Sequence, residues 1–372
     1  MTRRASGSAA AVSLVNTYAP VSTDRSAAGT LELPVYGPFD WQECLAYLGR
    51  SDLEVMHRIS DGRLVQPFEW NGSAVLLEIG CASGPPAAEA AYEAASGAGT
   101  EPAAEQRLVV AFPHGRPAPG LRQAAAAYVR DKFGLGDDLE PFYAMARRDP
   151  LLSPVVSAHR GLRLIGLPDL FEALVWAIIG QQINLTFAYR LKKRLVEAYG
   201  EALPGADITD EAGKPDEPFC LFPKPAAIAA LSPDDLRPMQ FSVRKAEYVI
   251  GAARLIEAGD LSKSGLLALG EAEAREALLR IRGVGAWTAD YVGMKTLRRA
   301  SAFPAGDAGL HQALKRGLGL SRRPLPAEIA AAAAPWRGHE AYATFYLWQS
   351  LLTPAPDQIP NPIPDSLSHP IS

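Results

Sequence analysis

In the first third of the chain, short apolar runs are separated by turn residues. The runs at residues 64–70, 74–79 and 108–112 are rich in β-branched, leucine and aromatic residues and predict β-strands. Residues 41–48 and 121–133 carry apolar positions at helical spacing and predict helices. Strands interspersed with helices predict a small α+β domain in this part of the chain.

After about residue 140 the β pattern disappears, and apolar residues recur three and four positions apart, as at Phe171, Leu174 and Ile178. The second half is therefore predicted to be mainly helical. The Ala-, Gly- and Pro-rich stretch at 84–106 predicts a long surface loop. Four segments are expected: a flexible tail at 1–30, an α+β domain at 31–140, a helical core at 141–352 and a Pro-rich tail at 353–372.

Composition narrows the class of protein. With 372 residues, of which 48% are hydrophobic, the chain can bury more than one apolar core. No run approaches the roughly 18 apolar residues that cross a membrane, and the start lacks a signal-peptide core, so we expect a soluble, cytoplasmic protein. Cys44, Cys81 and Cys220 are too far apart to predict a zinc or iron–sulfur site, and we expect reduced, mostly buried thiols.

The net charge of −4 does not suggest a nucleic-acid partner, but the charge is unevenly distributed. Between Arg280 and Arg323, nine Lys and Arg residues stand against two acids, Asp290 and Asp307. This segment carries a net charge of +7, which leaves −11 for the rest of the chain. A local basic excess of this kind is the pattern expected near a bound polyanion.

Two helical patterns within residues 278–292 are joined by only a few residues, which include Gly283 and Gly285. So tight a reversal needs a positive φ, which glycine adopts without a Cβ clash. The missing side chains also let backbone N–H groups at the start of the second helix approach a phosphate. Taken alone, the pattern fits an ordinary helix–helix turn equally well.

A segment containing Pro304 and Gly306 follows about one helix later and ends at Asp307. Asp307 precedes an apolar helical pattern, so a helix N-cap is one interpretation. Together with the hairpin, the segment resembles the helix-hairpin-helix DNA glycosylases, whose motif continues into a Gly/Pro-rich loop ending in a catalytic aspartate. The resemblance implies that Asp307 is catalytic, because a carboxylate stabilises the oxocarbenium charge that develops as a base leaves and can orient or deprotonate water.

The residue at position 287 indicates the subtype. Members of that family that also cut the DNA strand carry a lysine there, which forms a Schiff base with the sugar. This chain has Trp287, so the resemblance implies a monofunctional, hydrolytic glycosylase that leaves an abasic site. Lys295 lies eight residues further along the same predicted helix, more than two turns away, and is not expected to substitute.

The resemblance is strongest to the bacterial 3-methyladenine DNA glycosylase II family and extends from about Phe39 to Gln349. It implies an α+β, mainly α fold: an N-terminal domain with an antiparallel sheet, followed by two all-helical subdomains with a helix-hairpin-helix at 274–297. The segments that carry it are 39–41, 171–182, 335–337 and 342–348.

The same resemblance implies a base pocket lined by the aromatic side chains of Tyr47, Trp287, Tyr291 and Trp348. An alkylated purine is cationic, so stacking against electron-rich rings favours it by roughly 0.5–2 kcal/mol. Each ring taken singly is equally consistent with core packing. Convergence of the four rings on Asp307 would distinguish the two interpretations.

The implied partner is duplex DNA with damaged bases, from which the target nucleotide is flipped out. A Na⁺ or K⁺ ion is implied at the hairpin, held by the backbone carbonyls of Leu279, Ile281 and Val284, because carbonyl oxygens are hard ligands. No other cofactor is expected, and we expect a monomer. The residues implied to contact DNA through the hairpin are Gly283, Val284, Gly285, Ala286 and Thr288.

A flipping enzyme needs a side chain to fill the gap left in the duplex. The family's wedge position falls on Gln182, where the bacterial prototype has an apolar residue. A polar wedge can hydrogen-bond the orphaned base, Ile183 is an alternative intercalator, and an ordinary helix-terminal glutamine pair is a third interpretation.

The leading hypothesis is therefore excision of alkylated purines, of the 3-methyladenine and 7-methylguanine type, in base-excision repair. One alternative is a glycosylase of the same fold for uracil, hypoxanthine or an oxidised purine; the aromatic, apolar lining favours alkylated bases. Another is a non-catalytic helix-hairpin-helix DNA-binding protein. Asp307 argues against it, because a carboxylate facing the anionic backbone would only weaken binding.

Overall fold

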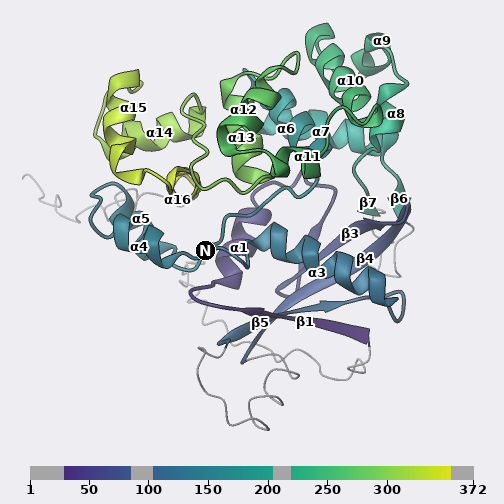
Figure 1. Cartoon of the computed structure of the whole chain (residues 1–372), viewed down its shortest axis with the longest axis horizontal. Helices are drawn as coiled ribbons and strands as arrows, with labels where there is room; N and C mark the ends of the chain where they lie inside the picture. The colour runs from purple at the N-terminus through teal and green to yellow at the C-terminus, as the bar shows by residue number, and fades with distance from the viewer. Residues whose placement is uncertain (1–28, 85–103, 204–218, 353–372) are drawn as a thin grey trace, which may run out of the picture.

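The computed structural model describes residues 29–84, 104–203 and 219–352. Most of both predicted tails and of the predicted 84–106 loop lies outside these residues. In Figure 1 the sheet occupies the lower part of the molecule and most helices lie above it. The division of the chain near residue 140 remains a prediction.

The larger sheet is antiparallel, with the strand order β1-β5-β4-β3-β2. The three strands predicted from the sequence are confirmed as β3, β4 and β5. Two strands were not predicted: β2 has three residues, and β1 contains Pro34, which is tolerated because β1 forms an edge of the sheet. The strands are β1 (Thr30–Val35), β2 (Arg58–Ser60), β3 (Arg63–Trp70), β4 (Ser73–Ser83) and β5 (Gln106–Ala111).

The sheet buries side chains on both faces. Leu64 pairs with Ile79 and Ile79 with Val110, so these three side chains share one face, which packs into the main core. On the opposite face, Val65 and Leu76 form a small separate core with a two-stranded sheet. Burial on both faces explains why β3 and β4 do not alternate cleanly between apolar and polar residues.

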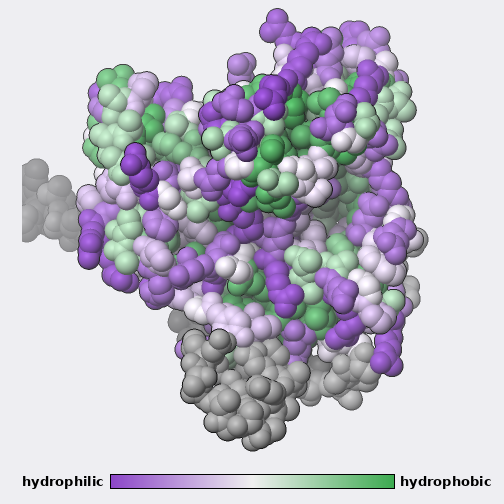
Figure 2. Space-filling view, viewed as in Figure 1, coloured by the Kyte–Doolittle hydropathy of each residue, from purple (hydrophilic) through white to green (hydrophobic). Residues whose placement is uncertain are grey.

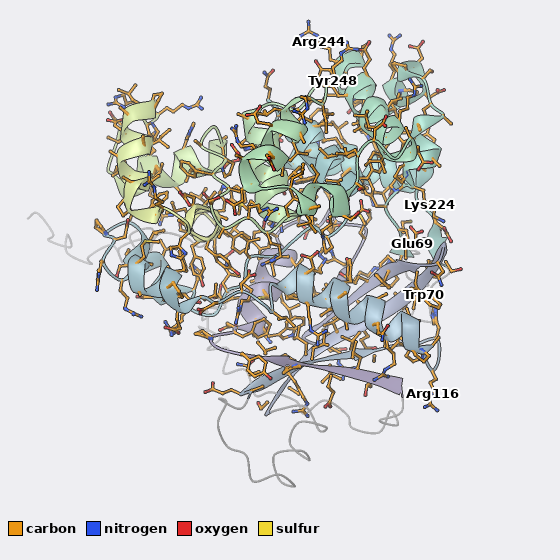
Figure 3. All side chains as sticks on the ribbon, viewed as in Figure 1. Glu69, Trp70, Arg116, Lys224, Arg244 and Tyr248 are labelled. Atoms are coloured by element: carbon orange, nitrogen blue, oxygen red, sulfur yellow. The ribbon has the colours of Figure 1, made fainter. Side chains whose placement is uncertain are left out.

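That second sheet pairs β6 (Ala202–Leu203) with β7 (Phe219–Cys220). It lies in the part of the chain where the sequence pattern predicted helices alone, and strands of two residues give no periodic signal. The Lys224 side chain secures this sheet, since its Nζ donates to the carbonyl of Gly72 at 3.1 Å and to Glu201 at 2.9 Å. Figure 3 shows Lys224 above Glu69 and Trp70 at this junction.

The remaining described elements are helices, and several start at a side-chain cap. Asp40, Asp169, Asn184 and Ser242 each accept a backbone N–H three residues ahead. The first helices are α1 (Trp41–Leu48), α3 (Pro119–Phe133), α4 (Glu140–Ala146), α5 (Leu152–Ala158), α6 (Leu170–Gly180) and α7 (Leu185–Tyr199). The later ones are α8 (Pro225–Ala229), α9 (Pro233–Leu236), α10 (Val243–Glu257), α11 (Lys263–Ala268), α12 (Glu271–Leu279), α13 (Ala286–Lys295), α14 (Ala308–Gly317), α15 (Pro326–Ala333) and α16 (Glu340–Gln349), with short 3₁₀ turns η2 (Arg237–Met239) and η3 (Ala334–Trp336).

Two large apolar cores organise these helices. One joins the sheet, α1 and α3–α5 to the C-terminal helices α14–α16, so both ends of the described chain share it. The other is formed by α6–α13. Helix α13 belongs to both, since Met294 lies in the first core and Val292 in the second. The antiparallel sheet with two helical groups confirms the predicted fold class.

Two further expectations concern burial. All three cysteines are buried, as predicted. No helix in the described parts of the chain combines the length and the apolar character needed to cross a bilayer. Figure 2 shows hydrophilic residues over the outer end of α10, whereas apolar colour covers the alanine-rich helix α15.

Candidate active site

The hairpin between α12 and α13 depends on Gly283. Its φ is +91°, a backbone conformation that residues other than glycine rarely adopt. A Cβ there would also lie 2.2 Å from the ring of Tyr248 on α10. Gly285 differs, because its φ is −94° and a Cβ would meet nothing within 4 Å. The sequence assigned positive φ to the reversal in general; the structure assigns it to Gly283 and leaves Gly285 as an exposed, open position.

The other predicted hairpin contacts are divided between surface and interior. Ala286 is exposed, whereas Val284 and Thr288 are buried. The Thr288 side chain is 1% exposed, and its hydroxyl accepts a hydrogen bond from Gln181 at 3.0 Å, so it faces the α6–α7 turn and not the surface. Arg282 is exposed and pairs with Glu247 at 2.8 Å.

The turn between α6 and α7 is held against this hairpin. Gln181 donates to the carbonyl of Gly283 at 2.9 Å, and Lys245 donates to the carbonyls of Ile179 and Gln181 at 2.6 and 2.9 Å. Gln182 has a φ of +57°, a conformation that costs a non-glycine residue roughly 1–2 kcal/mol. The turn thus presents an exposed Gln182, while Ile183 packs against the second core.

Asp307 both caps a helix and faces a cleft. One carboxylate oxygen, Oδ1, accepts the Leu310 N–H at 2.7 Å and the Trp348 indole N–H at 2.7 Å. The other, Oδ2, accepts the Trp287 indole N–H at 3.0 Å. Gly309 permits this approach, because a Cβ there would lie 3.1 Å from Trp348. The two interpretations of Asp307 from the sequence are therefore compatible.

The loop before Asp307 is held by His311. The Arg323 Nε donates to His311 Nδ1 at 2.8 Å, which leaves the proton on Nε2, and Nε2 donates to the Ala305 carbonyl at 2.6 Å. This chain of contacts fixes the backbone two residues before the carboxylate.

The cleft beside Asp307 has a volume of about 640 Å³. The cleft brings together the five residues predicted for the base pocket and catalysis, as well as both candidate wedge residues. The hairpin residues 283–286 and 288 do not line it. The predicted residues that line it are Tyr47, Gln182, Ile183, Trp287, Tyr291, Asp307 and Trp348.

The aromatic rings form a connected series around the cleft. Ring centroids lie 5.6 Å apart for Trp287 and Tyr291, and 6.2 Å apart for Tyr291 and Trp348. Phe345 continues the series, 6.5 Å from Trp348 and 4.6 Å from Tyr47. Burial raises the pKa of Tyr291 well above its ordinary value, so its hydroxyl stays neutral at physiological pH. The four rings converge with Asp307 on one cavity.

Several lining residues were not predicted from the sequence, and three of them have large side chains that bear on the site. Trp176 contributes a further ring, and Leu185, a large apolar side chain that is 51% exposed, lies next to the wedge turn. Arg50 stacks over Tyr47, with its Cζ 4.0 Å from the ring centroid. Arg50 and Leu185 each lie three residues from a predicted site residue, Tyr47 and Gln182 respectively. That spacing is a weak signal, because nothing in the local sequence shows that these side chains face the same cavity.

A smaller cavity of about 60 Å³ lies behind Tyr47, Arg50 and Tyr291, which line both spaces. Lys295 lines the inner cavity and donates to the Tyr47 hydroxyl at 3.3 Å. Burial, with repulsion from Arg50 and other cations, lowers the pKa of Lys295 well below its ordinary value. Lys295 is closer to the pocket than its sequence position suggested, but it is not among the residues that line the main cleft.

The basic excess between residues 280 and 323 does not form a single surface. Lys295 is 2% exposed, and Arg298 is bound to Asp137 and to the carbonyls of Asp131 and Leu164. Arg322 pairs with Glu328. The charge count was thus a poor guide to the surface presented to a partner.

A helix-hairpin-helix beside an aromatic cleft with a fixed carboxylate defines the class of protein. The model of the HhH-GPD superfamily of base excision DNA repair proteins matches residues 175–337. The DNA-3-methyladenine glycosylase of Bacillus subtilis (strain 168) is 44% identical over 230 residues, which cover 62% of this chain and 73% of the relative. The chain belongs to the HhH-GPD superfamily, as the resemblance predicted.

Two further proteins extend this similarity. DNA-3-methyladenine glycosylase 2 of Escherichia coli (strain K12) is 30% identical over 193 residues, and the match spans 52% of this chain and 61% of the relative. The solved 3-methyladenine DNA-glycosylase from Archaeoglobus fulgidus has a similar fold, with a TM-score of 0.66 and 22% identity over 86% of this chain and 97% of that one. The latter likeness supports the fold.

Proposed function

We propose that this chain is a monofunctional DNA glycosylase of base-excision repair that hydrolyses the N-glycosidic bond of alkylated purines in duplex DNA. The observation that carries the proposal is the Asp307 carboxylate, fixed by the Trp287 and Trp348 indoles at the wall of an aromatic cleft. The B. subtilis relative, named a DNA-3-methyladenine glycosylase, supports purines of the 3-methyladenine and 7-methylguanine type as substrates.

The reaction follows from the charges. A purine alkylated at N3 or N7 is cationic, so stacking on Trp287, Tyr291 and Trp348 favours it. As the bond between the base and C1′ breaks, its electron pair moves to the base, which leaves neutral, and positive charge develops on the sugar. Asp307 stabilises that charge. A water oxygen then bonds to C1′ and gives up a proton, for which Asp307 is the nearby base.

The indoles have a second role in this proposal. Each donates its N–H to a different oxygen of Asp307, and Leu310 N–H binds Oδ1 as well. A carboxylate already oriented before the substrate arrives needs no reorganisation when charge develops. The same side chains thus supply both the stacking faces and the orientation of the acid.

Binding to duplex DNA is assigned to the hairpin. Gly285 and Ala286 are exposed at the N-terminus of α13, where backbone N–H groups suit a phosphate. The carbonyls of Leu279, Ile281 and Val284 are suitable ligands for Na⁺ or K⁺, which would add positive charge near that phosphate. Ile281 already accepts the Val284 N–H at 3.0 Å and would offer its second lone pair.

Gln182 is assigned as the wedge. It is exposed at the mouth of the cleft in a turn held by the hairpin, whereas Ile183 packs inward. The neighbouring exposed Leu185 would support the gap in the duplex from the apolar side. Substitution of each residue in turn, with release from duplex and single-stranded substrates compared, would identify the wedge by a loss confined to the duplex.

Hydrolysis without strand cleavage is the expected chemistry. Trp287 occupies the position of the lyase lysine, and the Lys295 amine lies behind Tyr47 and not on the lining of the cleft. The test is incubation of purified protein with methylated duplex DNA. We expect free 3-methyladenine and 7-methylguanine, and a strand that breaks only after alkali. Release of neither base would overturn the proposal; release of hypoxanthine, uracil or an oxidised purine alone would reassign the lesion.

A further inference from the structure

The main cleft is electrically asymmetric. In the described chain its lining contains two charged residues, Asp307 on one wall and Arg50 on the other. Asp307 is the acid of the proposed function, and the reaction as derived gives Arg50 no part. A guanidinium at the wall of a pocket for cationic bases is unexpected, because like charges repel.

Arg50 has few partners. Its Nη1 donates to the Tyr47 carbonyl at 2.6 Å, and its Cζ lies 4.0 Å from the Tyr47 ring centroid and 5.8 Å from that of Tyr189. Within the described residues, no carboxylate lies within 4 Å of its guanidinium nitrogens. Arg50 is half-buried and retains N–H donors that protein groups do not occupy.

The cavity behind Arg50 reinforces the positive charge. Its two glutamates, Glu54 and Glu172, are both bound by Lys192, at 3.3 and 3.0 Å. Lys132 also lines it, is 7% exposed, and forms no ion pair in the part of the chain that the structure describes. Its pKa is lowered to about 8, chiefly by burial, so Lys132 still carries its charge at neutral pH. This side of the pocket therefore suits an anionic group.

We infer that the pocket accepts alkylated purines whose alkyl arm ends in a carboxylate, with the cationic ring stacked on the aromatic wall near Asp307 and the carboxylate bound by Arg50. A purine carrying a carboxymethyl group at a ring nitrogen has this charge distribution. The guanidinium fork matches a carboxylate geometrically. This inference rests on the proposed function and specifies which alkylated bases the site favours.

The test compares two duplexes that differ in charge and hardly in size. One carries 7-carboxymethylguanine and the other 7-carbamoylmethylguanine, with spontaneous release subtracted from each. We expect the enzyme to release the carboxymethyl base about 10-fold faster, the factor expected from one charge-assisted hydrogen bond. Arg50→Met should bring the ratio to about one, and Arg50→Lys, which keeps the charge, should retain part of the preference.

Release of 7-methylguanine is measured with the same proteins. If wild-type protein does not release 7-methylguanine, the proposed function is overturned. In that case the preference for the carboxylate is measured from binding of the two free bases, by quenching of the tryptophans that line the cleft. A wild-type ratio of one or below, in release or in binding, overturns the inference. An equal loss for all three bases in Arg50→Met also overturns it, since Arg50 would then contact DNA phosphate or support the fold.

Discussion

The two walls of the cleft hold their charges in different ways. On the C-terminal wall, Asp307 accepts three hydrogen bonds from Trp287, Trp348 and Leu310, and its position is fixed from three helices. On the N-terminal wall, Arg50 has one carbonyl and aromatic faces as partners, with Lys295 behind it. The C-terminal wall, with its fixed carboxylate, suits the bond cleavage that is common to every substrate. The N-terminal wall, where Arg50 has few partners, suits binding of the part of the base that varies.

The largest expected effect is on the fixed wall. Asp307→Asn removes the negative charge but keeps a side chain that caps helices equally well, so the fold should be retained. We expect base release to fall by about 10³-fold, the scale of a lost catalytic acid–base group. Binding to abasic DNA, measured in parallel, should be within a few-fold of wild type. Equal losses of release and binding would show that Asp307 acts chiefly as a cap.

The inner cavity behind the N-terminal wall should make the stability of the fold depend on pH through Lys132. The pKa of Lys132 is lowered to about 8, chiefly by burial. Below pH 8 the folded and unfolded chains are both protonated, and the folded state bears the full cost of the buried charge. Between pH 8 and about 10.5 the folded state releases its proton first, so the unfolding free energy rises with pH through this group.

Lys132→Met removes that titration. We expect its unfolding free energy to exceed that of wild type at pH 7 and the difference to shrink by about 3 kcal/mol by pH 10.5. Denaturant unfolding at several pH values measures it. A difference that does not change with pH would mean that Lys132 is not buried as a charge. Arg122→Met, which removes a half-buried cation from the same helix, serves as the control.

Trp348→Phe tests the fixed wall more finely. The ring remains for stacking, but the indole N–H that binds Asp307 at 2.7 Å is lost. We expect kcat for 7-methylguanine release to fall about 10-fold, the value of one hydrogen bond to a charged group, with little change in KM. Trp336→Phe is the matched control, because its indole binds Asp149 at 2.7 Å outside the cleft. It should lower Tm and leave kcat unchanged; a similar fall in kcat for both would count against a positioning role.

Tyr47→Phe should have the smallest effect. It keeps the ring that stacks with Arg50 and removes the hydroxyl that accepts from Lys295 at 3.3 Å. We expect the unfolding free energy to drop by about 1 kcal/mol and base release to stay within about two-fold. A large loss of activity would show that the Tyr47 hydroxyl, and with it Lys295, takes part in the chemistry.

The sequence predicted most of the local structure well. Helix α1 was predicted at its observed bounds, and strands β3–β5 within a few residues, because apolar periodicity reports which face of an element is buried. The predictions failed where periodicity is absent, as in the two-residue strands β6 and β7, or where a proline hid the edge strand β1.

The candidate site shows the same division. The motif resemblance named Asp307 and four aromatic residues, and the structure places all five on one cavity. Arg50 and Leu185 were missed, since an arginine after a short helix and a leucine at the start of another are ordinary surface residues by sequence. The basic count between 280 and 323 misled for the opposite reason, because Lys295 and Arg298 point inward.

The sequence by itself determined the elements whose physics is local. The tight reversal at 283–285 requires a glycine with positive φ, and Asp307 caps a helix through a bond to a residue three positions away. Tertiary structure alone decided that Tyr47, Asp307 and Trp348, far apart along the chain, meet around one cavity, because the two ends of the chain share a core. It also decided that Arg50 has no carboxylate partner among the described residues, since charge compensation depends on which distant side chains the packing brings near.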